Sequence, residues 1–388
     1  MKNLDKKLRL LRIAPSGCCS RIWEKFGSFR NLDQDWIEGL SEFNLRLYPN
    51  GTFNGFFKYA ENFYIYEISR RGIFKILLPL LLFLKAIRLI RKYRINVVHS
   101  NDIYFFGFSL LLAAKLCRKP FCISIHANHR KRNELDNSFI PRIMGLSFSA
   151  KWCEKIIYRY ADLVLPIRES IAKEIACPEN KTRIFPHVFD FEDFDKVTHI
   201  NTKNIYGIPE DAPMIVHAGR LSKDNYAEDI ANIAIKVCDS NEKVYFVICG
   251  NGPEEQNIKD KIKAAGFENR ILLPGSVPND IVFELRKQCV VNLCLMAGFS
   301  LIEACAGARP IISYDVEWHY ELVKDGETGF LVKEHDFSTA VEKILWLLSN
   351  PEKAVEMGKR AREIANERHS PQNVNKIKSE IYRELLAL

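Results

Sequence analysis

Two polar segments of the sequence directly follow apolar runs, and the first carries two cations suited to binding phosphate. The run MIVHA leads into GRLSKDN, in which a glycine bend presents Arg220 with Lys223 close behind it. A fixed guanidinium can hold two phosphate oxygens through parallel hydrogen bonds and can neutralise charge on a diphosphate leaving group. A structural ion pair with a carboxylate is the alternative role for Arg220.

The second polar segment combines a glycine, a predicted helix start and a carboxylate. The run VVNLCLM leads into AGFSLIEACA, where Gly298 allows close approach of a ligand to the backbone. The amide groups of Phe299, Ser300 and Leu301 stand where the helix is expected to begin and are predicted to point at an anion. Glu303 follows about one turn later and can accept hydrogen bonds from ribose hydroxyls. The alternative is an ordinary helix start with Ser300 as its cap.

Short apolar strands alternate with longer amphipathic helices, a pattern typical of parallel sheets covered by helices on both faces. Strands are predicted at residues 8–15, 95–100, 121–127, 162–167, 182–187, 214–219, 243–250, 270–276, 290–296, 309–315 and 329–333. Helices are predicted at residues 104–117, 150–160, 227–239, 254–265, 279–288, 300–307 and 337–349.

These elements predict an α/β chain of two doubly wound, Rossmann-like domains. The segment 189–213 is acidic and rich in turn residues, which marks it as the domain boundary. We expect domains at 1–195 and 204–370, followed by a C-terminal helix at 371–388. Ligands of parallel sheets bind beyond the carboxyl ends of the strands, so two such sheets predict an interdomain cleft.

The basic charge of the chain lies in its first half. The 388 residues carry a net charge of +8, but residues 1–200 hold 33 Lys and Arg against 20 Asp and Glu. The excess is concentrated around the apolar run 76–84 and the following KAIRLIRKYR. This pattern favours an anionic partner such as an acidic membrane leaflet or a lipid-linked phosphate, and a solvated helix face is the alternative. A nucleic-acid partner is not expected, because no motif interleaves aromatic and basic residues.

The remaining features predict a cytoplasmic protein without a metal site. The eleven cysteines lie mostly in apolar runs and form no CxxC pair, which is typical of buried thiols in a reducing compartment. His99, His217 and His319 adjoin strands without metal-ligand spacing and are expected to be structural. No apolar run reaches the ~20 residues of a spanning helix, and the N-terminus does not resemble a signal peptide.

The second half resembles, block by block and in order, the retaining GT-B glycosyltransferases of the glycosyltransferase group 1 type. The blocks are HAGRLSKDN, CGNGPEE, LPGSVP, GFSLIEACAGARPIISYD and YELVKDGETGFLV. More weakly, VVHSNDIYFFGFSLLLAAKLCRKPFCISIHA is similar to the family's acceptor-loop region, and YADLVLPIRESI and FPHVFDFEDF to the blocks that close its first domain. The resemblance implies a nucleotide-diphosphate sugar held mainly by the second domain and a glycan or lipid-linked acceptor held by the first. It also implies transfer with retention of anomeric configuration.

Residue by residue, the resemblance gives roles to the donor segments. It puts Arg220 at the donor phosphates, Glu303 at the ribose, and the backbone of 298–301 at the phosphates and sugar. Val277 falls where main-chain groups usually grip the base. No metal or other cofactor is expected, because Arg220, Lys223 and the helix amides supply the countercharge.

In the first domain, the resemblance implies two further site residues. His126 matches a histidine near the donor sugar, so that His126, Arg220 and Glu303 are the expected catalytic residues. Gly17 falls in the loop after the first strand, near the reaction centre. The loop HANHRKR at 126–132 follows a strand end, and its basic side chains are expected to face an acceptor phosphate.

Some positions depart from the family pattern. The first glutamate of the usual pair is replaced by Leu295. The phosphate-binding lysine five residues after Arg220 is replaced by Asn225, which is still expected among the donor-binding residues, and Lys223 is expected to substitute for the missing lysine. Ala308 stands where glycine is common. The leading prediction is a glycosyltransferase of cell-surface polysaccharide or glycolipid synthesis, peripheral on the inner face of a membrane. The departures leave open a non-catalytic sugar-nucleotide or glycan-binding subunit.

The stretch 71–94 is the predicted membrane contact. If its apolar side packs wholly on the first sheet, only a basic face with Arg88, Arg91 and Lys92 remains to meet anionic headgroups. Binding is then expected to be reversible and sensitive to salt. Pro79 is expected to mark a helix start rather than an interior position.

Overall fold

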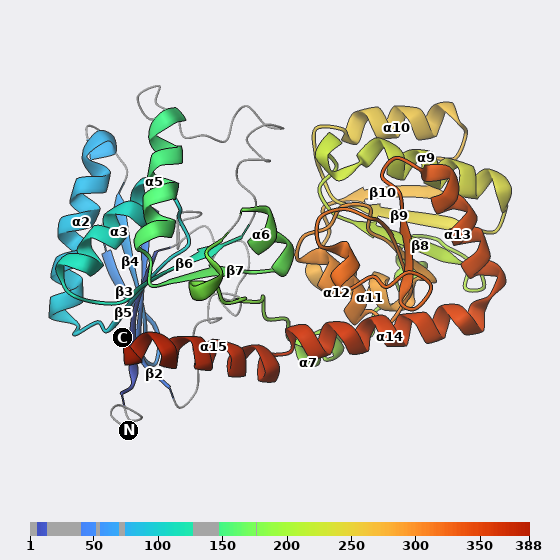
Figure 1. Ribbon diagram of the computed structural model, residues 1–388. Helices are drawn as coiled ribbons and strands as arrows, with labels where there is room; N and C mark the ends of the chain where they lie inside the picture. The colour runs from blue at the N-terminus through green and yellow to red at the C-terminus, as the bar shows by residue number, and fades with distance from the viewer. Residues whose placement is uncertain (1–5, 14–39, 52–54, 70–73, 127–146, 176) are drawn as a thin grey trace. The chain divides into compact units, whose positions relative to one another are not determined.

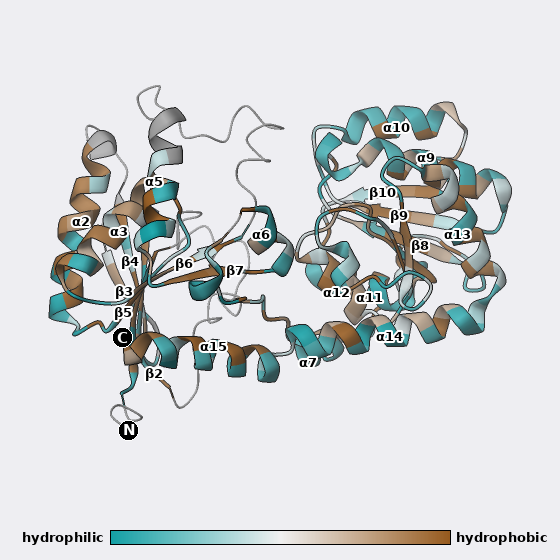
Figure 2. Cartoon of the chain, in the orientation of Figure 1, coloured by the Kyte–Doolittle hydropathy of each residue, from teal (hydrophilic) through white to brown (hydrophobic). Residues whose placement is uncertain are grey.

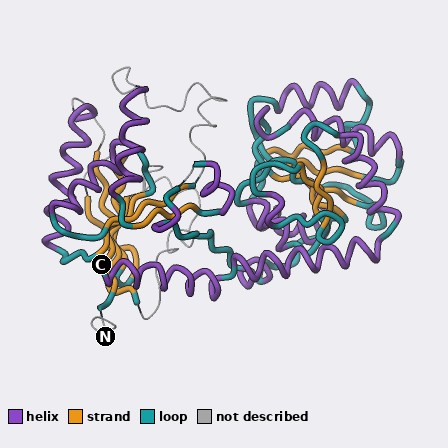
Figure 3. Tube along the Cα trace, viewed as in Figure 1, coloured by secondary structure: helices purple, strands orange, loops and turns teal. Residues whose placement is uncertain are grey.

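The computed structural model describes residues 6–13, 40–51, 55–69, 74–126, 147–175 and 177–388. The chain divides into two compact units, which are residues 1–188 with 372–388, and residues 189–371. Each unit is an open sheet with helices on both faces, as Figure 1 and Figure 3 show. The predicted α/β class is confirmed.

The first unit contains a seven-stranded sheet in the order β3-β4-β2-β1-β5-β6-β7. Neighbouring strands are parallel except for the antiparallel pair β3 and β4. The strands are β1 (Leu8–Ile13), β2 (Ser41–Gly51), β3 (Gly55–Ala60), β4 (Phe63–Ser69), β5 (Val97–Ser100), β6 (Phe121–Ile125) and β7 (Leu163–Pro166).

Four strands of this sheet match the sequence prediction, whereas β2, β3 and β4 were not predicted. Their apolar pattern is interrupted by Asn44, Arg46 and Glu67, which are nevertheless buried. The predicted strand at 182–187 was wrong, because this segment pairs with β7 only through an isolated bridge between Val164 and Thr182.

Helices cover both faces of the first sheet. Leu11 and Ile13 of β1 point to the face that carries α2 (Phe74–Lys92), α3 (Phe105–Leu116), α5 (Ser147–Tyr160) and α6 (Glu169–Glu174). Leu8 and Leu10 point to the opposite face, where α15 (Pro371–Ala387) packs through Tyr382 and its neighbours. The alternation of side chains along β1 thus gives this sheet two cores.

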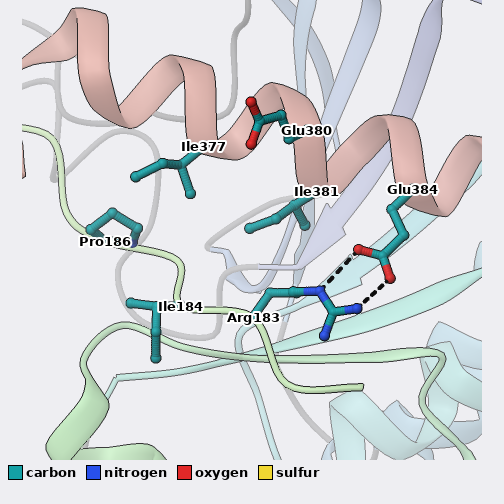
Figure 4. Close-up of a pocket in the computed structure, with 7 residues that line it drawn as sticks. All are labelled: Arg183, Ile184, Pro186, Ile377, Glu380, Ile381 and Glu384. Carbon is teal, nitrogen blue, oxygen red and sulfur yellow. Dashed lines mark hydrogen bonds and ion pairs between the residues drawn. The ribbon is translucent and has the colours of Figure 1, made fainter. Parts of the chain in front are cut away.

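The last helix is also tied to the first unit by polar contacts. His99 lies between the Tyr382 hydroxyl at 2.9 Å and the Ser124 hydroxyl at 2.6 Å, in keeping with the structural role expected for it. Arg183 binds Glu384 through two hydrogen bonds of 3.1 and 2.8 Å. Beside this pair lies a pocket of about 370 Å³ between α15 and the segment 183–186, shown in Figure 4.

Pro79 lies inside α2, so the expectation that it marks a helix start was wrong. An interior proline removes one backbone hydrogen bond and costs about 3 kcal/mol. Leu78, Leu82 and Leu89 are buried from the same helix against the sheet, and their burial offsets this cost.

The apolar side of α2 is only partly used in packing on the sheet. Four leucines of this helix are between 37% and 54% exposed, namely Leu77, Leu80, Leu81 and Leu84. The surface of α2 therefore carries apolar as well as basic side chains, in contrast to the purely basic face expected from the sequence. Among the described residues, no helix is long and apolar enough to cross a membrane.

The second unit contains a six-stranded sheet, entirely parallel, in the order β10-β9-β8-β11-β12-β13. The strands are β8 (Met214–Ala218), β9 (Tyr245–Cys249), β10 (Ile271–Gly275), β11 (Val291–Leu293), β12 (Ile311–Tyr314) and β13 (Gly329–Val332). Each lies within a predicted strand. The four central strands, β9, β8, β11 and β12, are short apolar runs that are buried almost throughout, a pattern typical of parallel sheets.

Helices α9 (Ala227–Ser240), α10 (Glu255–Ala264) and α13 (Phe337–Ser349) share one core with this sheet. The opposite face carries α11 (Asn279–Gln288), α12 (Ser300–Ala306) and α14 (Pro351–His369). The short elements of this unit are α7 (Phe191–Asp195), α8 (Thr202–Ile205), η3 (Lys223–Asn225) and η4 (His319–Glu321), whereas η2 (Glu179–Lys181) belongs to the first unit.

The division between the units falls earlier than the expected end of the first domain at 195. Phe189, Phe191 and Phe194 pack in one cluster with Phe283 and Phe299 of the second unit. These aromatic side chains attach α7 to the second unit, because their burial there removes a large apolar area from water.

Candidate functional site

The loop after β8 holds Arg220 outward on a fixed backbone. The Gly219 N–H donates to the Cys249 carbonyl at 3.0 Å, and the Leu221 N–H donates to the Asn251 carbonyl at 3.1 Å. Leu221 is buried, whereas the side chains of Arg220 and Lys223 are exposed. Neither cation forms an ion pair with a carboxylate of the described residues. The structural alternative for Arg220 therefore has no support in this part of the chain.

Two glycines after β9 allow the Arg220 loop to pack this closely. A Cβ on Gly250 would lie 1.8 Å from the Gly219 carbonyl oxygen, and one on Gly252 would lie 1.9 Å from the Leu221 carbonyl oxygen. Gly250 also has a φ of +131°, a conformation that favours glycine. The sequence analysis named CGNGPEE only as a block, but its glycines are the surface on which the Arg220 loop rests.

Asn225 shapes the same loop from within. Its side-chain amide donates to the Ser222 hydroxyl at 2.9 Å, and η3 ends at Tyr226, which has a φ of 56°. Asn225 thus stabilises the turn that carries Lys223. In this position it leaves Lys223 as the exposed cation of η3.

The segment before α12 presents open backbone at Gly298. A Cβ on Gly298 would meet no atom of the described residues within 4 Å, so the backbone is open on this side. Ser300 is the first residue of α12 and not its cap, since the cap position is Phe299. The Leu301 N–H donates to the Gly298 carbonyl at 3.2 Å, so this amide is not free, contrary to the sequence prediction.

Trp318 and His319 anchor the backbone just before Gly298. The Trp318 indole N–H donates to the Ala297 carbonyl at 3.1 Å. The His319 Nε2 lies 3.1 Å from the Ala297 nitrogen, and its Nδ1 contacts the Ser313 hydroxyl. His319 is therefore a buried structural residue, as expected, and it fixes the start of the Gly298 segment.

Glu303 lies on α12 with 21% of its side chain exposed. Its Oε2 is 3.8 Å from Nη2 of Arg286, a fully buried side chain of α11. Burial raises the pKa of the Glu303 carboxyl, and the Arg286 guanidinium opposes this rise. The carboxylate thus has one side toward solvent and the other toward a buried cation.

Sequence reasoning missed Arg286, although a signal was present. Arg286 falls on the same helical face as Val282, Leu285 and Cys289, where an apolar residue is expected. A basic residue on the apolar face of a helix needs a charged or hydrogen-bonding partner inside the fold, because an unpaired buried charge is costly.

Leu295 and Val277, two positions that the sequence analysis singled out, lie in different surroundings. Leu295 is fully buried in the core of the second unit, which explains why this position holds an apolar residue and not a second carboxylate. Val277 follows β10 and packs half-buried against the apolar cluster to which Met214 and Val216 of β8 belong. Its main chain is therefore held at the carboxyl edge of the sheet.

In the first unit, the structure describes one of the expected site residues. His126 follows β6 directly, and its ring centroid is 5.6 Å from that of His187. Gly17 and the basic loop 127–132 lie outside the described residues.

The fold defines the class of the protein. Two Rossmann-like units with parallel sheets form the GT-B glycosyltransferase fold, which is also that of HepE from Anabaena in its complex with UDP. This chain resembles HepE with a TM-score of 0.72 at 16% sequence identity, over 98% of this chain and 100% of HepE.

Sequence comparison identifies the family. Residues 199–364 match the glycosyl transferases group 1, and residues 52–193 match Glycosyltransferase Family 4. The chain belongs to the group 1 glycosyltransferases, as its sequence blocks indicated.

Two enzymes illustrate the relatives of the chain. The alpha-D-kanosaminyltransferase of Streptomyces kanamyceticus is 23% identical over 72% of this chain and 74% of its own length. The alpha-monoglucosyldiacylglycerol synthase of Acholeplasma laidlawii is 21% identical over 79% of this chain and 80% of its own length.

Proposed function

We propose that this glycosyltransferase moves a sugar from a nucleotide-diphosphate donor to a glycan or lipid-linked acceptor with retention of anomeric configuration. The observation that carries the proposal is the pair of charged groups after β8 and β11, which are neighbours in the second sheet. Arg220 stands after β8 without a carboxylate partner among the described residues, and Glu303 stands after β11 on α12. A cation and a carboxylate at adjacent strand ends can bind the two parts of a nucleoside diphosphate, since the cation can hold the phosphates and the carboxylate the ribose.

In this proposal, the second unit holds the donor. Arg220 and Lys223 bind the diphosphate, and Glu303 accepts hydrogen bonds from the ribose hydroxyls. The open backbone at Gly298 receives the phosphates and the sugar, while the main chain of Val277 holds the base. Uridine diphosphate is the first nucleotide to test, because HepE binds UDP with the same fold.

The transfer breaks the bond between the anomeric carbon and the phosphate oxygen. The acceptor hydroxyl oxygen bonds to the same face of that carbon, and its proton passes to the departing phosphate oxygen. Negative charge grows on the leaving diphosphate, where Arg220 and Lys223 stabilise it without a metal ion. From the first unit, His126, which directly follows β6, is the proposed residue for the donor sugar in this scheme.

We also propose that the first unit binds an anionic membrane, reversibly, through α2. Exposed leucines such as Leu80 and Leu84 lie on the same helix as the exposed Arg88 and Arg91. Such a helix inserts apolar side chains at the level of the headgroups while its cations meet anionic lipid. A membrane contact fits a lipid-linked acceptor and a role in polysaccharide or glycolipid synthesis, on the inner face of the membrane. The name of one relative, alpha-monoglucosyldiacylglycerol synthase, supports a lipid-linked acceptor.

Two measurements test the proposed reaction. A thermal-shift screen with UDP, GDP, ADP and CDP identifies the base, because a ligand of the folded state raises the unfolding temperature. Turnover of the matching nucleotide sugars with a lipid or glycan acceptor, followed by NMR of the product, then reports the anomeric configuration. An inverted product contradicts the retaining mechanism.

Binding without turnover supports the second candidate function, a non-catalytic sugar-nucleotide or glycan-binding subunit. The buried Leu295 favours this candidate, because it leaves the site with one carboxylate of the usual pair.

A further inference from the structure

Arg286 connects three elements beneath the candidate donor site. From α11, its Nη1 donates to the Asn292 Oδ1 of β11 at 3.2 Å, and its Nη2 donates to the Ala218 carbonyl of β8 at 3.4 Å. The same Nη2 lies 3.8 Å from Oε2 of Glu303 on α12. One guanidinium thus contacts the strand end that leads to Arg220 and the helix that carries Glu303.

Asn292 strengthens the connection to α12. Its side-chain amide donates to the Ala304 carbonyl at 3.4 Å while its oxygen accepts from Arg286. Asn292 is fully buried, as is Arg286. A buried cation needs an opposite charge and hydrogen-bond acceptors. Among the residues that the structure describes, Glu303 is the carboxylate that forms an ion pair with Arg286.

We propose that Arg286 is the positioning residue of the donor site, which holds the Glu303 carboxylate ionised and in place for the ribose and fixes the end of β8 below Arg220. The proposal rests on the donor site proposed above. Two ribose hydroxyls need an acceptor-only carboxylate, since a protonated carboxyl loses acceptor capacity. Arg286 acts from the buried side, so the solvent side of Glu303 stays available to the ligand.

The other titratable groups around this pair do not supply the same charge. On β8, burial lowers the pKa of His217 to about 4, so this histidine is neutral above that pH. Burial raises the pKa of four nearby thiols. They are Cys249 of β9, Cys289 just after α11, Cys305 of α12 and Cys294 just after β11. On α14, Arg362 is paired with Asp195. Arg286 is therefore the cation that faces Glu303 within the described residues.

If Arg286 only stabilises the fold, its loss should leave the pH dependence of ligand binding unchanged. If it positions Glu303, its loss should shift that dependence. Arg286→Met has a similar volume and removes the charge, so Glu303 remains buried without its cation. Loss of an opposite charge within 4–6 Å raises the pKa of a carboxyl by about one unit or more. As the pH is lowered, the nucleotide affinity of Arg286→Met should therefore begin to fall at a higher pH than that of the wild type.

The experiment measures the affinity of UDP, GDP, ADP and CDP by calorimetry from pH 5 to 8. In Arg286→Met, we expect the midpoint of the acid-side loss to rise by about one pH unit, which raises donor KM by up to about tenfold at pH values below the wild-type midpoint. The kcat at saturating donor should change much less, because Arg286 does not touch the donor. Arg286→Lys keeps the charge and should restore most of the wild-type midpoint.

Glu303→Gln is the matched control. It should weaken binding and remove the part of the acid-side dependence that Glu303 contributes, leaving the part due to the terminal phosphate of the nucleotide. Adding Arg286→Met to it should change the pH profile no further. If Arg286→Met fails to fold, Asn292→Ala frees the guanidinium from one acceptor and should move the midpoint in the same direction by less.

The outcomes separate the two proposals. If Glu303→Gln weakens binding but the midpoint is the same in Arg286→Met, or in Asn292→Ala where that variant replaces it, the positioning role is overturned and the donor site stands. If Glu303→Gln binds every nucleotide as the wild type does, or if no nucleotide binds the wild type, the donor site fails and the role of Arg286 fails with it.

Discussion

The two units of the chain present different surfaces to their surroundings. In the second unit, the outer helices carry ion pairs such as Lys259 with Glu255 at 2.7 Å on α10 and Lys353 with Glu356 at 2.8 Å on α14. In the first unit, α2 exposes leucines beside cations. Figure 2 shows this contrast, with α2 largely brown and α10 largely teal. The charged surface of the second unit favours solvent and a charged ligand, whereas the mixed apolar and basic surface of α2 in the first unit favours an amphipathic partner.

The charge of the sequence follows the same division. Residues 1–200 hold 33 basic against 20 acidic side chains, whereas the rest of the chain holds 23 against 28. The second unit nevertheless places Arg220 and Lys223 at its strand ends, so a local cationic site exists on a unit of acidic balance. In our proposal, the donor site therefore depends on a few positioned residues, whereas membrane binding depends on the summed charge and apolar area of a surface.

The largest expected effect tests the positioned residues of the second unit. Arg220→Ala should lower kcat/KM for the nucleotide sugar about 100-fold, because the guanidinium stabilises charge that grows on the leaving diphosphate. The kcat should fall together with the affinity. Initial rates over a range of donor concentrations measure both.

Lys263→Ala is the control for this variant. Lys263 is also an exposed cation of the second unit, near the end of α10 and away from the carboxyl ends of the strands. Both variants should keep the wild-type unfolding temperature, since both side chains are exposed. An equal loss of rate in the two variants would show a general charge effect and would remove Arg220 from the site.

The next effect tests the summed surface of the first unit. Replacing Leu80 and Leu84 together with Ser should weaken binding to phosphatidylglycerol vesicles by roughly tenfold, because each leucine contributes apolar burial at the interface. Replacing Arg88 and Arg91 with Gln should weaken binding mainly at low salt. Sedimentation with vesicles at several salt concentrations separates the two contributions.

Ser substitution of Leu116, an exposed leucine at the end of α3, is the matched control. Unchanged binding after both α2 substitutions would contradict a membrane role for α2. A soluble acceptor would then be the better proposal for the first unit.

The last prediction concerns the acid stability of the second unit. The pKa of His217 is lowered by burial from its usual 6.5 to about 4, so the unfolded chain binds a proton at this residue first. The free energy of unfolding should therefore fall by about 1.4 kcal/mol per pH unit as the pH drops from 6.5 toward 4. His217→Asn retains an amide donor for the Leu293 carbonyl and should flatten this slope.

Urea unfolding between pH 4.5 and 7 measures the slope. The same substitution at the exposed His199 serves as the control. A slope that is equal in wild type and His217→Asn contradicts the buried neutral state of this histidine.

The sequence was sufficient for the second sheet because its strands are continuous apolar runs. It was insufficient for β2 and β4, where Arg46 and Glu67 are buried from positions that local pattern assigns to solvent. Burial of such residues depends on partners distant in the sequence, which periodicity does not report.

The candidate site shows the same limit. Arg220 and Glu303 could be proposed from the sequence because each follows a strand that ends at the carboxyl edge of the sheet. Arg286 and Asn292 could not be paired with them in advance, because their contacts join α11, β11 and α12 only in the folded unit. Leu301 was misjudged because its amide is taken by a turn bond to Gly298.

A crystal structure of the complex with the nucleoside diphosphate that gives the largest thermal shift tests the central claim most directly. The account predicts diphosphate oxygens within hydrogen-bond distance of the Arg220 guanidinium and ribose hydroxyls on the Glu303 carboxylate. Gly298 should lie against the phosphates, and Arg286 should remain beneath Glu303. A nucleotide bound to the first unit, or one that leaves Arg220 and Glu303 without contact, would contradict it.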